Sequence, residues 1–326
     1  MSSEVAKHSS LSTPVVLIIF NRPSETRKVF DEIAKAQPRQ LFIVSDGPRM
    51  NVAKDDELVK ECREIVSKVT WECEVHLKFS NENLGCRVSV ASGLSWVFGQ
   101  VDRAIILEDD CIPASDFFYL CQTLLEIYSD DHSVGSVSGS NLDGSQMIGY
   151  RPTYYASKFP SVWGWATWKR LWDEYTPDLS AFSRREIFEV VLYGCKSWSS
   201  RLYWLRKLFL VRSNKIDTWD YQFVFAHWRQ RCSSLISSSN LVTNIGFGPG
   251  ATHTLIQSSV YSKIPLGSIG SAIIHPSRAE ISEQTSSGVG ESRFKATISR
   301  TMAEWVFYSL PQGLGLWVQK HLVKLR

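Results

Sequence analysis

Short apolar runs alternate with amphipathic helical patterns over the first 140 residues, and this alternation constrains the fold more than any other feature. The clearest runs are "PVVLIIF" at 14–20, "LFIVSDGP" at 41–48 and "RAIILEDD" at 103–110. Continuous β-branched runs of this length are typical of strands that are buried on both faces. Helical spacing of apolar residues fills the segments between them. The order predicts an α/β fold with a mostly parallel central sheet and helices on both faces.

Polar residues follow each run where the strand is expected to end. They are Asn21 and Arg22 after the first run, Asp46 and Gly47 after the second, and the acidic triplet Glu108, Asp109 and Asp110 at the end of the third. Ligands of parallel α/β sheets bind outside the carboxyl ends of the strands. The sequence therefore predicts a binding site where these strand ends meet.

The acidic triplet is costly at the end of a buried strand, because unpaired buried carboxylates are unfavourable and like charges raise one another's pKa. A dinucleotide loop with the pattern G-x-G-x-x-G does not follow the first strand, which continues as "NRPSET". Mn²⁺ or Mg²⁺ would offset the cost, since such ions bridge one or two carboxylates to a diphosphate. The alternative is that the acids cap the next helix, but Pro113 and Ser115 can begin that helix without them. We therefore prefer a metal site that holds a diphosphate.

Composition excludes several classes of protein. The 326 residues carry a net charge of only +3, too little for the dense basic face that binds nucleic acid. The seven cysteines include no C-x-x-C pair, which favours free thiols in a reducing compartment over zinc or disulfides. The N-terminus has no apolar signal core, and no apolar run approaches the roughly 20 residues of a membrane helix. These features predict a cytoplasmic, soluble protein.

Tryptophans and basic residues are concentrated in the second half. Trp163 and Trp165 flank Gly164, which suggests a tight loop whose indoles contact a sugar, with core packing as the alternative. The basic residues between 201 and 215 form either a solvated helix face or a contact for an acidic lipid-linked acceptor or membrane. The tail at 302–326 mixes apolar and basic residues, so it is a helix docked on the core or, alternatively, a peripheral contact with an anionic membrane.

Several segments in order resemble glycosyltransferases of the GT-A fold that use nucleotide sugars, and most closely the N-acetylglucosaminyltransferase I family and its bacterial relatives. The acidic segment "IILEDDCIPASDFF" is similar to that family's aspartate motif. Further similar segments span residues 14–254, and they are "PVVLIIFNRPSETRKVFDEI", "LFIVSDGP", "SVSGSNLDG", "KFPSVWGWATWKRLWDEY", "TWDYQ" and "NIGFGPGATHT".

The resemblance implies a metal-dependent, inverting glycosyltransferase that moves a sugar from a nucleotide-sugar donor, which we expect to be UDP-linked, to a glycan or lipid-linked acceptor. By analogy, the product would be a surface polysaccharide or lipopolysaccharide. Arg22 and Asp46 would hold the nucleotide base, and Asp109 would contact the ribose. Asp110 would ligate the metal, supported by Glu108.

The resemblance also assigns roles to Asp220 and His253. Asp220 would be the general base, because an inverting transfer is a single displacement in which a carboxylate takes the proton of the incoming hydroxyl. Asp217 is the rival base, and on one helix both would share a face. His253 would be a further metal ligand or a phosphate contact, with a structural role as the alternative.

The expected organisation is one GT-A domain in two parts. Residues 1–13 would be flexible, 14–150 would form the nucleotide-sugar-binding subdomain, 151–276 would carry the acceptor site and the base, and 277–326 would form a polar loop and a helical tail. A non-catalytic nucleotide-sugar or glycan binder on the same scaffold is the first alternative function. A sugar nucleotidyltransferase is the second, although it needs glycines that "NRPSET" lacks.

Overall fold

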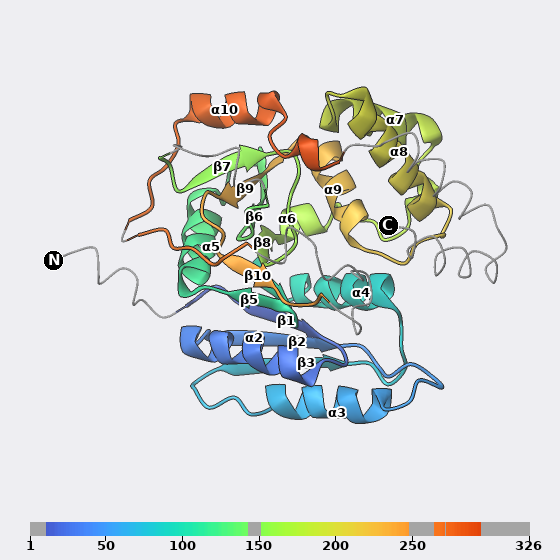
Figure 1. Cartoon of the computed structure of the whole chain (residues 1–326), viewed down its shortest axis with the longest axis vertical. Helices are drawn as coiled ribbons and strands as arrows, with labels where there is room; N and C mark the ends of the chain where they lie inside the picture. Colours follow the sequence, from blue (N-terminus) through green and yellow to red (C-terminus); the bar gives the residue numbers. More distant parts are fainter. Residues whose placement is uncertain (1–10, 143–150, 248–263, 271, 295–326) are drawn as a thin grey trace.

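A computed structural model describes residues 11–142, 151–247, 264–270 and 272–294 of the chain. Its centre is an eight-stranded sheet with the order β3-β2-β1-β4-β8-β6-β9-β7 (Figure 1). The strands are β1 (Val15–Ile19), β2 (Gln40–Ser45), β3 (Glu74–Phe79), β4 (Arg103–Glu108), β6 (Val134–Ser138), β7 (Tyr154–Ser157), β8 (Trp165–Trp168) and β9 (Ser233–Ser237). A two-stranded sheet pairs β5 (Cys111–Pro113) with β10 (Val242–Asn244). The predicted α/β architecture with a mostly parallel central sheet is confirmed.

The register of the parallel strands aligns their carboxyl ends. β1 pairs in parallel with β2 on one side and with β4 on the other. Ile19 lies opposite Ser45, and Ile18 lies opposite Glu108. The residues that follow these three strands therefore emerge at the same edge of the sheet.

Helices cover both faces of this parallel half. They are α2 (Pro23–Ala36), α3 (Asp55–Val66), α4 (Cys86–Phe98) and α5 (Ser115–Ile127). α2, α3 and α5 pack on the side of the sheet that carries Val15, Leu17 and Ile19. α4 packs on the other side, which carries Val16 and Ile18. Successive residues of β1 thus enter opposite apolar layers, which explains why its sequence is apolar at every position.

The second half of the chain extends the same sheet. β8 lies antiparallel between β4 and β6, so the described residues of 14–150 and of 151–276 contribute strands to one sheet. Its helices are α6 (Lys169–Trp172), α7 (Arg184–Gly194), α8 (Trp198–Arg212) and α9 (Asp220–Arg229), together with the 3-10 turn η2 (Leu179–Ala181). α7, α8 and α9 enclose a separate apolar cluster around Trp204 and Trp228, and Figure 1 shows these three helices grouped together.

Residues 277–294 differ from the predicted polar loop. They form α10 (Arg278–Ser287) and the 3-10 turn η4 (Glu291–Arg293). Ser277 and Glu280 make a reciprocal capping box at the start of α10. The Gln284 side chain accepts a hydrogen bond of 2.9 Å from the backbone N–H of Ala156, on the edge strand β7. The helix lies beside that strand (Figure 1) and covers part of a sheet edge that would otherwise be open.

Residues 12 and 13, the last two of the segment predicted to be flexible, are anchored on α5. The backbone N–H groups of Ser12 and Thr13 donate to the side-chain oxygen of Gln122 on α5. Residues 1–10 and the tail from 295 onward lie outside the described residues, and the interpretations placed on them remain predictions. All seven cysteines are free thiols. Within the described ranges, no helix has the length and apolar character needed to cross a membrane.

Candidate functional site

A cavity of about 490 Å³ lies at the carboxyl ends of β1, β2 and β4. Segments from the second half of the chain form the rest of its wall, including residues 217–220 at the start of α9. The predicted site residues that line it are Arg22, Asp46, Glu108, Asp109, Asp110, Trp163 and Asp220, and the rival base Asp217 lines it too. The fold therefore brings residues that are up to 200 positions apart into one site.

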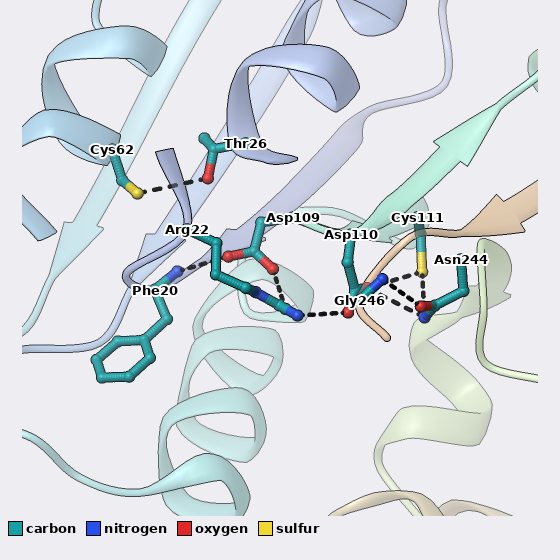
Figure 2. A network of polar contacts seen from close by, with 9 residues as sticks. All are labelled: Phe20, Arg22, Thr26, Cys62, Asp109, Asp110, Cys111, Asn244 and Gly246. Atoms are coloured by element: carbon teal, nitrogen blue, oxygen red, sulfur yellow. Dashed lines mark hydrogen bonds and ion pairs between the residues drawn. The ribbon is translucent and has the colours of Figure 1, made fainter. Parts of the chain in front are cut away.

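Arg22 pairs with two members of the acidic triplet. Its guanidinium forms ion pairs with Asp109 and with Asp110, the second at 2.7 Å between Nη1 and Oδ2. Figure 2 shows the guanidinium lying between the two carboxylates. Burial acts to lower the pKa of Arg22, but the two aspartates outweigh it and raise the pKa above its usual value. Arg22 was predicted to hold a nucleotide base, whereas here it is the counter-ion of the acids.

Asp109 has the most enclosed carboxylate of the triplet. It is 2% exposed and also accepts a hydrogen bond of 3.2 Å from the backbone N–H of Phe20. Burial raises the pKa of Asp109 to about 6, although the charge of Arg22 acts in the opposite direction. The expected ribose contact is not what this arrangement favours, because both oxygens of Asp109 already fix the loop after β1.

Glu108 is the least neutralised member of the triplet. Its carboxylate lines the cavity and has no hydrogen bond or ion pair with any residue that the structure describes. Burial, followed by the charges of Asp110 and Asp109, raises the pKa of Glu108 to about 8, and Asp220 adds to this effect. Negative charge is therefore disfavoured beside Glu108, so a positive group that enters this part of the cavity would be stabilised.

A segment from the far end of the chain completes the surroundings of Asp110. β10 pairs antiparallel with β5, so the side chain of Asn244 reaches Asp110 and donates to its Oδ1 at 3.2 Å. Gly246 approaches from the same segment, and a Cβ atom there would lie 2.0 Å from Asp110 Oδ2. The sequence analysis singled out the segment "NIGFGPGATHT", which begins at Asn244, but gave no role to Asn244 or Gly246.

Asp46 organises a loop and leaves no acceptor position for a ligand. One carboxylate oxygen accepts from the backbone N–H groups of Gly47 and Leu84, and the other accepts from Gly85 N–H and the Asn83 side chain. These four donors match the acceptor capacity of a carboxylate. Burial raises the pKa of Asp46, and the backbone hydrogen bonds counteract this. The expectation that Asp46 holds the base is therefore replaced by a role in shaping the 83–85 loop.

The two rival bases have different surroundings, and the expectation that they share a helix face is wrong. Asp217 precedes α9, and its two oxygens accept from the backbone N–H groups of Cys86 and Arg87 at 3.0 and 3.1 Å. Asp220 is the first residue of α9. One of its oxygens, Oδ1, accepts from the Thr218 hydroxyl and from Tyr221 N–H. The other oxygen, Oδ2, has no hydrogen bond within the described part of the chain, so Asp220 keeps one oxygen wholly available, whereas each oxygen of Asp217 already accepts one backbone N–H.

The two tryptophans predicted to contact a sugar lie in different environments, one at the cavity and one in the core. Trp163 lines the cavity, and its ring meets Phe247 edge-on at 5.8 Å. Trp165 is 0% exposed and stacks on Trp219 in the apolar layer beneath α4 and α9. The predicted sugar contact of Trp165 is therefore wrong, because β8 turns its indole inward. His253 lies outside the described residues.

The oxygen donors at this site suit a cation that is held mainly by a bound diphosphate and by only one or two protein carboxylates. Within the described ranges no three His, Cys, Asp or Glu side chains are grouped as ligands for one metal ion. Mg²⁺ and Mn²⁺ that accompany diphosphates need only one or two carboxylates. Asp110 supplies a hard oxygen donor, and the Gly246 backbone lies so close to it that a Cβ atom there would be 2.0 Å from Asp110 Oδ2, so a cation would have to approach from the cavity side. The residues present fit such an ion, provided that Arg22 moves away from Asp110.

Comparisons with known proteins concern the fold. No protein-family model and no curated protein matches the chain. Among solved structures, it is similar to a UDP-glucose pyrophosphorylase complexed with UDP-glucose, with a TM-score of 0.35 and 8% identity over 69% of this chain and 90% of the other. It is also similar to HddC from Yersinia pseudotuberculosis complexed with GMP-PN, with a TM-score of 0.33 and 12% identity over 50% of this chain and 80% of the other. At this level of similarity, the chemistry of the site has to follow from its own residues.

Proposed function

We propose that the chain is a metal-dependent, inverting glycosyltransferase that transfers a sugar from a UDP-linked donor to a glycan or lipid-linked acceptor. The observation that carries the proposal is the presence of two separate carboxylate groups in one cavity, the triplet that ends at Asp110 and the single acid Asp220. A single displacement needs this division, because one group serves the leaving diphosphate and the other serves the incoming hydroxyl. By the resemblance of its motifs, we assign it to the synthesis of surface polysaccharide or lipopolysaccharide.

Asp220 is suited to act as the base. Its Oδ1 is fixed by Thr218 and Tyr221, so the side chain is held in one orientation and Oδ2 remains available. In the reaction, Oδ2 takes the proton of the acceptor hydroxyl while that oxygen bonds to the anomeric carbon. The bond from the anomeric carbon to the diphosphate breaks at the same time, and the nucleoside diphosphate leaves with that electron pair. Cation binding neutralises charge on this leaving group.

The donor would occupy the wall formed by the first half of the chain. Asp110 would hold the metal beside the diphosphate, and Arg22 lies within reach of the same position. Phe20, Arg49 and Asn83 line the part of the cavity near the Asp46 loop. The Asn83 amide nitrogen is used by Asp46 and Gly47, which leaves its carbonyl oxygen as an acceptor. We place the nucleotide base here, with Asn83 as its contact in place of Asp46.

The acceptor would enter from the second half of the chain. Trp163 lines the cavity and offers an indole face to a sugar ring. α8, which precedes the Asp220 segment, carries the cations Arg201, Arg206, Lys207 and Arg212 and contains no acidic residue. Its Trp198 is 71% exposed and its Leu202 is 47% exposed. The cations are half-buried beside this exposed apolar pair. Apolar side chains flanked by basic residues suit an anionic membrane, so we propose a lipid-linked acceptor that is met at such a surface.

The deciding experiment compares Asp220→Asn with Asp110→Ala. UDP and Mn²⁺ together should raise the Tm of the wild type more than either alone, and Asp110→Ala should remove the contribution of the metal. Asp220→Asn should keep the joint shift but lose transfer by about 10²–10⁴-fold, the usual contribution of a general base. Asp217→Asn is the matched control, and its loss should be much smaller. Full turnover in Asp220→Asn would refute the base, and no hydrolysis of any UDP-sugar by the wild type would indicate a non-catalytic binder.

A further inference from the structure

Arg22 and the predicted cation compete for the same oxygen atom. The Oδ2 atom of Asp110 is 2.7 Å from Arg22 Nη1, and Asn244 and the Cys111 thiol both reach Oδ1. Both oxygens of Asp110 are therefore in use, as Figure 2 shows for these contacts. A divalent cation bound to Oδ2 would lie next to the guanidinium, where two positive groups repel each other.

The backbone of residue 246 limits where the Arg22 guanidinium can move when it leaves Asp110 Oδ2. A Cβ atom on Gly246 would lie 2.0 Å from Asp110 Oδ2 and 2.7 Å from Arg22 Nη1, so the backbone of residue 246 closes tightly over the ion pair. Arg22 must swing into the cavity before a cation can bind to Asp110. The cavity itself contains the position predicted for a diphosphate, and an arginine fork binds phosphate oxygens in the same bidentate manner as it binds carboxylates.

The geometry points to Arg22 as an internal substitute for the cation, one that excludes the metal until a nucleoside diphosphate draws the guanidinium away from Asp110. This inference rests on the proposed role of Asp110 as the metal ligand. It requires metal and diphosphate to strengthen each other's binding, because the diphosphate releases the oxygen that the metal needs. It also gives Asp109 and Asp110 a counter-ion at rest, since buried carboxylates without one would be costly.

The test uses Mn²⁺ alone as the probe, with the full chain and no nucleotide. Arg22→Gln should bind Mn²⁺ more tightly than the wild type, by about tenfold, which is within the usual range of a coupling between two sites. Arg49→Gln is the matched control, because Arg49 lines the same cavity and carries the same charge but pairs with Asp55. Its Mn²⁺ affinity should stay close to that of the wild type. An equal gain in both variants would show a general charge effect and would overturn the proposal.

Adding UDP then shows whether Arg22 occupies the cation position and is released by the diphosphate, or only repels Mn²⁺ by its charge. In the wild type, UDP should tighten Mn²⁺ binding, and in Arg22→Gln most of this gain should be lost because the oxygen is already free. Arg22→Lys keeps the charge without the fork and should bind Mn²⁺ with an affinity between those of the wild type and Arg22→Gln. Adding Asp110→Asn to Arg22→Gln should abolish the gain, which would assign it to Asp110. Circular dichroism and thermal unfolding of each variant identify any that fail to fold, and Arg22→Lys then carries the comparison.

The outcomes distinguish this inference from the proposed function. Unchanged or weaker Mn²⁺ binding in Arg22→Gln and Arg22→Lys overturns the competition while leaving transferase activity possible. Failure of every form to bind Mn²⁺, with or without UDP, overturns both the metal assignment and the competition. Tighter Mn²⁺ binding in Arg22→Gln without any detectable sugar transfer by the wild type supports the competition and counts against the transferase alone.

Discussion

The carboxylate of Asp217 caps α4 by accepting the backbone N–H of Cys86 at 3.0 Å, across 131 positions of the sequence. The N-cap residue of α4 is Gly85, which has no side chain to fill this role. The contact ties α4, which follows the 83–85 loop, to the segment that carries Asp220. We infer that Asp217 positions the Asp220 segment, so its removal should loosen both walls of the cavity.

Asp217→Ala should lower kcat by about tenfold, because a small displacement of a catalytic group has an effect of this order or larger. It should also cost about 1 kcal/mol of stability, the usual loss on removing a helix cap. Steady-state kinetics over a range of pH would check this, with Ser183→Ala, which removes the cap of α7, as the control for stability alone. Disappearance of the base limb of the pH profile in Asp217→Ala would instead make Asp217 the base.

Gly246→Ala should weaken binding of Mn²⁺ with UDP by about tenfold or more, while the chain stays folded. The added methyl group would lie 2.0 Å from Asp110 Oδ2, so either the carboxylate or the 244–246 backbone has to move. Overpacking of this kind typically costs 1–3 kcal/mol, and about 1.4 kcal/mol is a tenfold change in affinity. Isothermal titration measures the change. Gly267→Ala, whose Cβ would meet Ser239 at 3.3 Å, should retain wild-type affinity.

The parallel half of the fold was predictable because its determinants are local. β1 is apolar at each of its five positions, and this pattern has few interpretations other than a strand covered on both faces. The register of β1 with β2 and β4 then places Arg22, Asp46 and Glu108 at one edge without further information. Their position in the fold follows from order and hydrophobicity alone.

The environment of each side chain depended on contacts that the sequence does not display. Trp165 could have faced the ligand or the core, and the decision is made by Trp219, far along the chain, on which it stacks. The capping partner of Asp217 is equally remote. In contrast, α10 had a local signal that was overlooked, since Ser277 and Glu280 have the spacing of a capping box. The polar, Ser-rich composition of this segment is typical of a loop, although its first residues carry the capping signal of a helix.

The contribution of His227 to the free energy of unfolding should fall as the pH decreases from about 6.5 toward 4. The ring is fully buried, with Nδ1 3.0 Å from the Phe223 carbonyl oxygen and Nε2 2.8 Å from the Ser136 hydroxyl. Burial lowers the pKa of His227 to about 4, against an ordinary value near 6.5. Between these values the unfolded chain binds a proton that the folded chain does not. The contribution of His227 to the free energy of unfolding is therefore complete above pH 6.5. Its loss by pH 4 approaches about 3 kcal/mol.

Urea unfolding of the wild type and His227→Gln at several pH values isolates this effect. Glu108 and Asp109 act in the opposite sense, because their raised pKa values make the folded chain bind protons first as the pH falls. Subtracting the free energy of unfolding of His227→Gln from that of the wild type at each pH removes the contribution of Glu108 and Asp109. The slope of stability against pH should be smaller in His227→Gln, by up to about 1.4 kcal/mol per pH unit. Parallel slopes between pH 4 and 6.5 would show that His227 titrates normally.

The exposed face of α8 should bind anionic vesicles. A basic helix with apolar side chains lies at the boundary of headgroups and acyl chains, where each Lys or Arg contributes about 1 kcal/mol on an anionic surface. The protein should float with vesicles that contain phosphatidylglycerol, remain free with pure phosphatidylcholine, and dissociate as salt screens the charges.

Trp198→Ser combined with Leu202→Ser should reduce binding by about tenfold or more, since burial of each side chain contributes about 1.5–3 kcal/mol. The matched control is Leu77→Ser combined with Ile127→Ser, which removes comparably exposed apolar side chains from β3 and α5. Equal losses in both double variants, or equal flotation with both lipids, would show that α8 is not the membrane-facing surface.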